Sequence, residues 1–257
     1  MTVNYHTHTA RCHHASGTER EYIETAITRG LKTLGFSDHS PQFFPTDDYY
    51  SHFRMRPEET DGYVKTLREL QKEYRADIDI KIGFEVEYYP EIFDKLIEFL
   101  HPYELDYILL GQHFINNEYD TYEHSTGKNH TDAQLKIYTD QILEAIKTGK
   151  FTYIAHPDVF RYEGDEALYE VEARRLCEGA KAHGIPLEVN FLGLSEGRHY
   201  PSERFYRIAK KSGCEFVFGC DAHRPNDVLN PDTYKKICDF ADSLGITPTE
   251  NIKLRKI

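Results

Sequence analysis

The chain has 257 residues, 39% of them hydrophobic, and carries 31 basic against 43 acidic side chains, for a formal net charge of −12. A surface this acidic repels nucleic acid and anionic lipid, and no apolar run approaches the roughly 18 residues that a membrane span requires. The amino terminus, MTVNYHTH, lacks the basic flank and apolar stretch of a secretory signal, and the five cysteines show no CxxC spacing. We therefore expect a cytoplasmic protein without a disulfide framework or a thiolate zinc site.

Strand-like runs alternate with amphipathic stretches along the chain. A capping box formed by Thr18 and Glu21 opens the first predicted helix and Gly30 closes it. Seven strand–helix units predict a parallel sheet, and they favour a closed or nearly closed barrel over an open doubly wound sheet. The predicted strands cover 3–8, 33–39, 80–88, 107–114, 152–158, 186–191 and 215–223, and the helices cover 18–30 and, approximately, 57–75, 91–100, 131–148, 166–183, 202–212 and 232–244.

Residues that commonly bind metals stand at the carboxyl ends of six of these strands. In a barrel these ends share one face, and residues two apart on a strand point the same way. A lone histidine is usually structural, but this joint pattern predicts a metal site. The residues are His6 and His8, His39, Glu85 and Glu87, His113, His156, and Asp221 with His223, and His14 can fold back from the first loop to join them.

Eight or nine nitrogen and oxygen ligands exceed what one ion binds, so two or three ions are expected. This ligand set suits Zn, Mn or Fe. Glu85 is the natural bridging ligand, because a carboxylate has two oxygens. The remaining histidines follow no such pattern and are interpreted as surface residues, with His124 and His130 as candidate loop contacts; these are His52, His101, His124, His130 and His183. Long connections at 40–59 and 115–130 are expected to carry function.

Together these motifs resemble the PHP (polymerase and histidinol phosphatase) superfamily. The resemblance covers essentially the whole chain and is carried by HxH in the first strand, His14, SDH, GFEVEYYP, GQHFI, AHPD and GCDAH. EVEYYP and the Tyr/Phe-rich loop after the second strand are similar to the histidinol-phosphatase branch. The resemblance implies a distorted (β/α)7, TIM-like barrel, a single domain over residues 1–257, and three divalent ions. It assigns His6, His8, Glu85 and Asp221 to one ion, Glu85, His113 and His156 to a second, and His14, His39 and His223 to the third.

The implied reaction is hydrolysis of L-histidinol phosphate in histidine biosynthesis, by attack of a metal-bridging hydroxide. Arg161 and Arg198 follow the fifth and sixth strands on the same face and are assigned to the phosphate. His199 is a candidate proton donor to the leaving group, and Ser195 is a further candidate contact. Asp38 is expected to make a structural hydrogen bond, whereas Glu87 and Asn190 are expected to support the ligands.

Three alternatives stay open at this point. A related phosphatase or phosphodiesterase could use the same centre on nucleotides or another small phosphate ester. Metal-dependent amidohydrolases also begin with HxH, but they typically have eight strands and often a carboxylated lysine that YILLGQHF lacks. A non-catalytic PHP module predicts eroded ligands, and none is missing. The expected partner is a small-molecule phosphate monoester, with neither nucleic acid nor membrane; the oligomeric state is left open. Candidates for recognising the imidazole and amine are Phe43, Phe44, Tyr49 and Tyr50.

Overall fold

Short parallel strands form the centre of the fold. The computed structural model describes residues 1–46, 49–120 and 123–257, and within these ranges it contains six β-strands and eight α-helices. One sheet has the order β1-β2-β3-β4, and β5 pairs with β6 in a second; every pairing is parallel. The strands are β1 Val3–Asn4, β2 Thr33–His39, β3 Asp79–Val86, β4 Tyr107–Leu110, β5 Leu187–Asn190 and β6 Phe216–Gly219.

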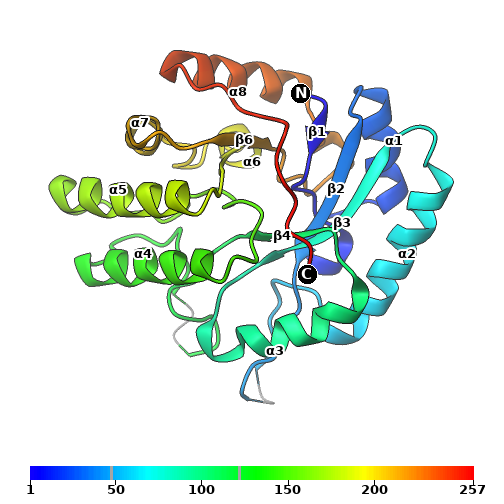
Figure 1. Cartoon of the computed structure of the whole chain (residues 1–257), viewed down its shortest axis with the longest axis horizontal. Coiled ribbons are helices and arrows are strands. Elements are labelled where there is room, and N and C mark those ends of the chain that lie inside the picture. The colour runs from blue at the N-terminus through cyan, green and yellow to red at the C-terminus, as the bar shows by residue number, and fades with distance from the viewer. Residues whose placement is uncertain (47–48, 121–122) are drawn as a thin grey trace.

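Helices connect the strands and lie around the outside of them (Figure 1). The predicted capping box is confirmed, since Thr18 N–H donates to Glu21 Oε2 at 2.7 Å. The helices are α1 Glu19–Thr28, α2 Thr60–Glu73, α3 Pro90–Leu100, α4 Asp132–Lys147, α5 Glu166–Ala182, α6 Phe191–Ser195, α7 Glu203–Ser212 and α8 Pro231–Leu244, with 3-10 turns η1 Ala10–Cys12, η2 Pro57–Glu59, η3 His101–Tyr103 and η4 Pro225–Asp227. Within the described part of the chain, no helix combines the length and apolar character needed to cross a bilayer.

The expected seven-stranded barrel is found only in part. The predicted strand at 152–158 is present only as a short parallel segment. Ile154 makes single parallel bridges to Leu110 and Leu187, and Thr152 N–H and Ala155 N–H donate to the β4 carbonyls of Ile108 and Leu110. The backbone leaves the extended region at His156, where φ is 29°. The first strand is also shorter than predicted: β1 ends at Asn4, and beyond it Thr7 makes a single parallel bridge to Ala222. The result is an α/β fold with a curled parallel sheet.

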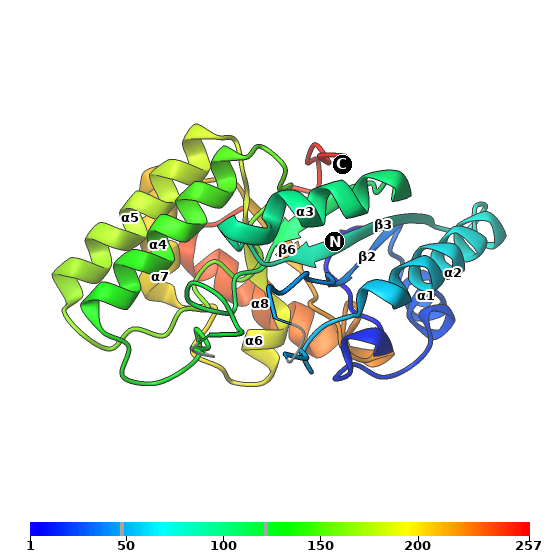
Figure 2. The ribbon, with the colours of Figure 1, turned by 90° about the horizontal axis from the view of Figure 1, so that it is seen from below.

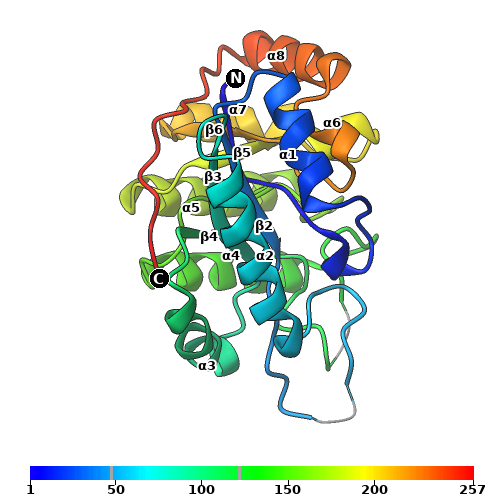
Figure 3. The same ribbon diagram turned by 90° about the vertical axis from the view of Figure 1, so that its right-hand side faces the viewer.

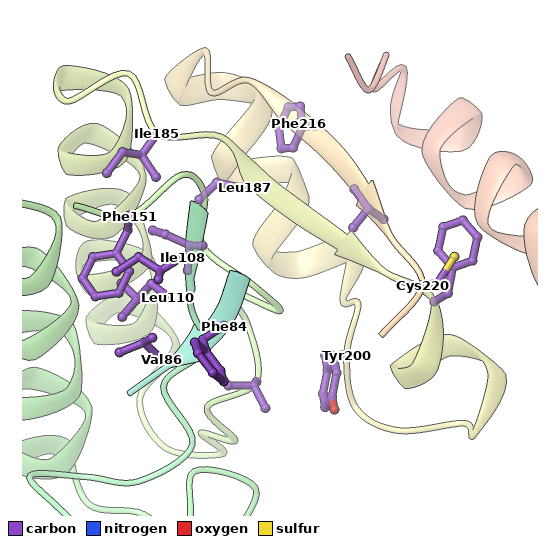
Figure 4. Packing of buried hydrophobic residues seen from close by; sticks show 14 of the residues in the cluster. Phe84, Val86, Ile108, Leu110, Phe151, Ile185, Leu187, Tyr200, Phe216 and Cys220 are labelled. Atoms are coloured by element: carbon purple, nitrogen blue, oxygen red, sulfur yellow. The ribbon is translucent and has the colours of Figure 1, made fainter. Parts of the chain in front are cut away.

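Alternating side chains of the strands face two different environments. On β3, Ile82, Phe84 and Val86 join the main apolar core beneath the helices, and Figure 4 shows Val86 close to the β4 side chains Ile108 and Leu110. A smaller apolar cluster includes Leu109, which alternates with these on β4, and it is formed by Tyr107, Leu109, Tyr153, Ala155 and Val217. On one flank, α1 and α2 lie side by side (Figure 3), and Arg20 of α1 donates to Glu73 of α2.

The amino ends of the strands are covered by the carboxyl-terminal segment of the chain. Ile252 and Leu254 pack against the smaller apolar cluster, and Thr249 N–H donates to Phe216 O at 2.7 Å, at the start of β6. Figure 2 shows the long connections and α6 on the side away from the C-terminus. Because one end is covered in this way, the carboxyl ends of the strands are left to form the functional site.

Candidate metal centre

The sequence-predicted ligands meet at the carboxyl ends of the strands. The parallel register of β2 and β3 pairs His39 directly with Glu85, and His39 Nδ1 lies 3.1 Å from Glu85 Oε2. Gly111 leaves the space that the Glu85 side chain occupies, since a Cβ at this position would overlap the carboxylate. The pattern that placed both residues at strand ends therefore brings them into contact.

His6, His8 and Asp221 form the first group of converging ligand atoms. His8 Nε2 lies 3.0 Å from Asp221 Oδ1 and 3.2 Å from His6 Nε2. All three side chains are buried, and one nitrogen or oxygen from each lies within 4.8 Å of the others. Asp221 has a φ of 49°, a left-handed backbone conformation that costs energy in a non-glycine residue and is often found at functional sites.

Glu85 lies between two sets of imidazoles. Its Oε1 is 2.7 Å from His156 Nε2 and 3.8 Å from His113 Nε2. The same oxygen is 3.6 Å from His6 Nε2. Because Oε2 faces His39 while Oε1 faces His156, the two oxygens point toward different ligand groups, as a bridging carboxylate requires.

The last two predicted ligands, His14 and His223, lie nearer the surface. Their Nε2 atoms are 3.1 Å apart, and His8, His39 and His223 form a further group of converging ligand atoms. His14 Nδ1 donates to Cys12 O at 2.8 Å, which leaves its Nε2 free of a proton in the neutral ring. All nine predicted ligands therefore lie around one centre.

The charge balance and hydrogen bonding of this cluster fit cation binding. Among the described residues, the buried atoms Glu85 Oε2 and His39 Nδ1 lie 3.1 Å apart without the geometry of a hydrogen bond, and neither has a hydrogen-bond partner elsewhere, although such atoms are normally paired. Burial would raise the pKa of Glu85, but His39, His113 and His6 outweigh it and hold that pKa well below its usual value. Burial lowers the pKa of both His39 and His223, so these rings keep the neutral form that binds metals.

Hydrogen bonds to backbone and carboxylate groups fix several of the ligands. Glu87 contacts the predicted ligand His113: its Oε1 is 2.9 Å from His113 Nδ1 and its Oε2 accepts from His113 N–H. Asp38 makes the structural contacts expected of it, since it accepts from Thr9 and from the His39 N–H. The contact between Glu87 and His113 Nδ1 orients that ring from behind, an arrangement typical of metal-binding histidines, whereas Asp38 fixes the backbone of His39.

Glu188 on β5 is a supporting residue that our sequence reasoning missed. It is fully buried, its Oε1 lies 2.7 Å from His6 Nδ1, and its Oε2 accepts from His156 N–H at 2.9 Å. Asn190 Nδ2 also donates to Oε2, and to Asp221 Oδ2 at 3.1 Å. A lone charged residue inside the apolar run PLEVNF was the signal that could have identified it.

Substitution Glu188→Gln should weaken metal binding about 10- to 100-fold, the usual cost of losing a carboxylate behind a ligand histidine. The amide has only one acceptor oxygen, whereas the His6 ring and the His156 backbone N–H each bond to a different oxygen of Glu188. Competition with a chelating dye measures the affinity. Glu178→Gln, on the exposed side of α5, is the matched control and should leave it unchanged; wild-type affinity in Glu188→Gln would contradict the supporting role.

A cavity of about 750 Å³ opens over the cluster. Arg161, Arg198 and His199 all line it, together with the ligands His14, His39 and His113. The side chains of Arg161 and Arg198 pair at its edge with Glu163 and Glu196 respectively. Both arginines thus line the same cavity as the predicted metal ligands, and their contact with phosphate stays a prediction.

The structure gives His199 less freedom than a proton donor to the leaving group needs. Its Nε2 lies 2.8 Å from the carbonyl oxygen of Val159, to which only a protonated nitrogen can donate. Burial lowers the pKa of His199, so the ring is neutral and its single hydrogen is directed at that carbonyl. The proposed acid role of His199 stays a prediction that this geometry does not favour. Ser195 Oγ donates to Leu192 O.

The aromatic candidates for substrate recognition do not line the cavity. Phe43, Phe44, Tyr49 and Tyr50 border a separate surface depression, because Phe43 packs on Phe99 of α3 and Phe44 on Tyr49. Two other aromatic residues do line the cavity, Tyr200 and Phe53, and the ring centroid of Phe53 lies 4.2 Å from that of His39. Residues 47–48 of this connection, and 121–122 of the 115–130 connection, lie outside the described residues.

A buried ion pair joins the two long connections behind the centre. Arg54 Nε lies 3.0 Å from Glu118 Oε2, and both side chains are almost completely buried. Arg54 also approaches Glu87 Oε1 at 3.5 Å, and Glu118 accepts from the hydroxyl of Tyr89 at 3.2 Å. Because Glu87 contacts His113, the ion pair between Arg54 and Glu118 links the segments 40–59 and 115–130 to a predicted metal ligand.

The fold and the centre together define a class of protein: an α/β protein that gathers imidazoles and carboxylates for divalent ions at the carboxyl ends of parallel strands. The chain belongs to the PHP domain family, whose model matches residues 4–191.

Named relatives match over most of their length. A protein of Deinococcus radiodurans described as a probable histidinol-phosphatase is 29% identical, with 87% of this chain and 86% of that protein covered. The histidinol-phosphatase of Bacillus subtilis is 28% identical over 87% of this chain and 94% of its own. In structure, the chain is similar to the histidinol phosphate phosphatase of Lactococcus lactis complexed with zinc, L-histidinol and phosphate, with a TM-score of 0.73, 19% identity, and coverage of 98% and 97%.

Proposed function

We propose that this protein is a metal-dependent phosphomonoesterase that hydrolyses L-histidinol phosphate to L-histidinol and phosphate. The observation that carries the proposal is the cavity, which has the imidazole–carboxylate cluster as its floor and Arg161 and Arg198 at its side. The names of the relatives from Deinococcus radiodurans and Bacillus subtilis support the same activity. So does the description of the Lactococcus lactis structure.

We assign the metals to the ligand sets that the resemblance implies. His6, His8, Glu85 and Asp221 would hold one ion, Glu85, His113 and His156 a second, and His14, His39 and His223 a third. The groups His6–His8–Asp221 and His6–Glu85–His156 support the first two sets, and the short distance between His14 and His223 supports the third. Divalent ions at these positions would supply an activated water nucleophile and would neutralise phosphate charge.

The residues of this chain hold the substrate in place for that chemistry. The guanidinium groups of Arg161 and Arg198 would bind phosphate oxygens through paired N–H donors. Glu87 and Glu188 keep His113 and His6 oriented. The buried floor excludes bulk water from one side of the phosphate, which strengthens these electrostatic interactions.

We further propose that residues 1–257 form a single domain whose strands follow one another around a ring in chain order, as in a distorted (β/α)7 barrel. Single parallel bridges support this arrangement, because Ile154 joins β4 to β5, and Thr7 pairs with Ala222 between the ends of β1 and β6.

Phosphate release from purified, metal-analysed enzyme tests the function. We expect kcat/KM for L-histidinol phosphate to exceed that for nucleoside monophosphates. A large preference for nucleotides would contradict L-histidinol phosphate as the substrate but would still support phosphatase activity. Absence of phosphate release from every monoester, with the metals in place, would overturn the enzyme class.

A further inference from the structure

His124 lies in the cavity, whereas the sequence analysis placed it among surface histidines. Its backbone forms an antiparallel bridge with Phe114, and the next residue, Ser125, donates through its N–H to the carbonyl of His113 at 2.7 Å. The carbonyl of Ser125 accepts from the Arg161 N–H at 2.8 Å. The backbone of His124 is therefore anchored both to a predicted metal ligand and to a predicted phosphate-binding arginine.

The ring of His124 is also held in one orientation. It makes edge-to-face contacts with Phe114 and Phe53 at centroid distances of 5.0 and 6.1 Å, and its centroid lies 6.0 Å from that of His113. Its Nδ1 lies 3.2 Å from the Thr126 backbone nitrogen and 2.9 Å from the Thr126 hydroxyl. The ring thus cannot rotate without losing these contacts.

These hydrogen bonds decide which ring nitrogen carries the proton. A backbone N–H can only donate, so Nδ1 must accept from Thr126 and must itself be unprotonated. The proton of the neutral ring is therefore on Nε2, at the opposite edge. Within the described ranges of the chain, no acceptor forms a hydrogen bond with this nitrogen, and His124 lines the cavity.

We propose that His124 contacts the substrate, donating a hydrogen bond from Nε2–H to a phosphate oxygen beside the guanidinium groups of Arg161 and Arg198. This assignment rests on the proposed function. A fixed donor selects an acceptor: the ammonium of the substrate only donates, its neutral imidazole has a single acceptor nitrogen, and its dianionic phosphate has several acceptor oxygens. The neighbouring arginines mark the anion-binding side of the cavity, so the phosphate is the group that meets this donor.

A matched pair of substitutions distinguishes the roles of the two ring nitrogens, Nδ1 and Nε2. In His124→Asn, the amide oxygen replaces Nδ1 and can accept from Thr126, but the Nε2 donor is lost. In His124→Gln, the amide nitrogen replaces Nε2 and restores the donor. We expect the first substitution to weaken binding of inorganic phosphate to the metal-loaded enzyme about 10- to 100-fold, as for a lost hydrogen bond to a charged group, and the second to stay within about threefold of wild type.

Isothermal titration calorimetry with inorganic phosphate measures this difference, with metal content determined for each protein and kcat/KM as a second readout. Wild-type phosphate affinity in His124→Asn, equal losses in both variants, or a loss that follows reduced metal content would overturn the assignment. If wild type binds phosphate but does not hydrolyse L-histidinol phosphate, the substrate proposal fails, and the calorimetric comparison still decides the role of His124.

Discussion

Substitution Glu85→Gln is expected to remove bound metal and to lower turnover about 1,000-fold, since each ion contributes several kcal/mol of transition-state stabilisation and 1.36 kcal/mol is a factor of ten. Glu85 is buried, and its two oxygens face different imidazole groups. The amide keeps the size of the side chain but lacks its charge. Elemental analysis after gel filtration, paired with a phosphate-release assay, measures both effects.

The physical reason lies in the charge balance of the cluster. Divalent ions at the centre must be neutralised by few carboxylates, because most of the ligands are neutral imidazoles. Removing the charge between two ligand groups therefore affects more than one ion. Glu91→Gln, at the exposed start of α3, provides the control and should retain metal and activity. Full metal content with normal turnover in Glu85→Gln would refute the bridging role.

The sequence predicted which side chains converge more accurately than it predicted the extent of the strands. Alternation and strand ends suffice to bring His39 beside Glu85, because a parallel register follows directly from that pattern. They overestimate the strand predicted at 152–158, where only the first part of TYIAHPD hydrogen-bonds to its neighbours and the extended backbone stops at His156. At the turn, His156 N–H donates to Glu188 of β5, and this distant contact leaves no signal within residues 152–158 themselves.

Residues that act from behind the ligands were the hardest to predict. Glu188 and Arg54 become meaningful only when their partners, far away in the chain, are known. His124 was interpreted as a surface residue and candidate loop contact because it lies in a loop, away from the predicted strand ends, yet it bridges to Phe114 and lines the cavity. Long connections carry information in their tertiary contacts rather than in their composition, which limits what a single sequence reveals.

The ion pair between Arg54 and Glu118 leads to the largest expected effect on stability. In Arg54→Met, the carboxylates of Glu118 and Glu87 stay buried without their cation. Breaking a buried pair in this way costs about 3–5 kcal/mol in the free energy of unfolding. For a chain of this size we expect the thermal midpoint to fall by roughly 6–20 °C, measured by circular dichroism.

A second substitution separates the contribution of the buried charges to stability from the contribution of side-chain packing. In the double variant Arg54→Met with Glu118→Leu, one of the two stranded charges is replaced by an apolar group, so part of the lost stability should return. Arg174→Met breaks an exposed pair with Glu170 on α5 and serves as the control, with an expected cost below about 1 kcal/mol. If Arg54→Met melted within 2 °C of wild type, about the shift expected for an exposed pair, the two long connections would not depend on this charge for their attachment to the centre.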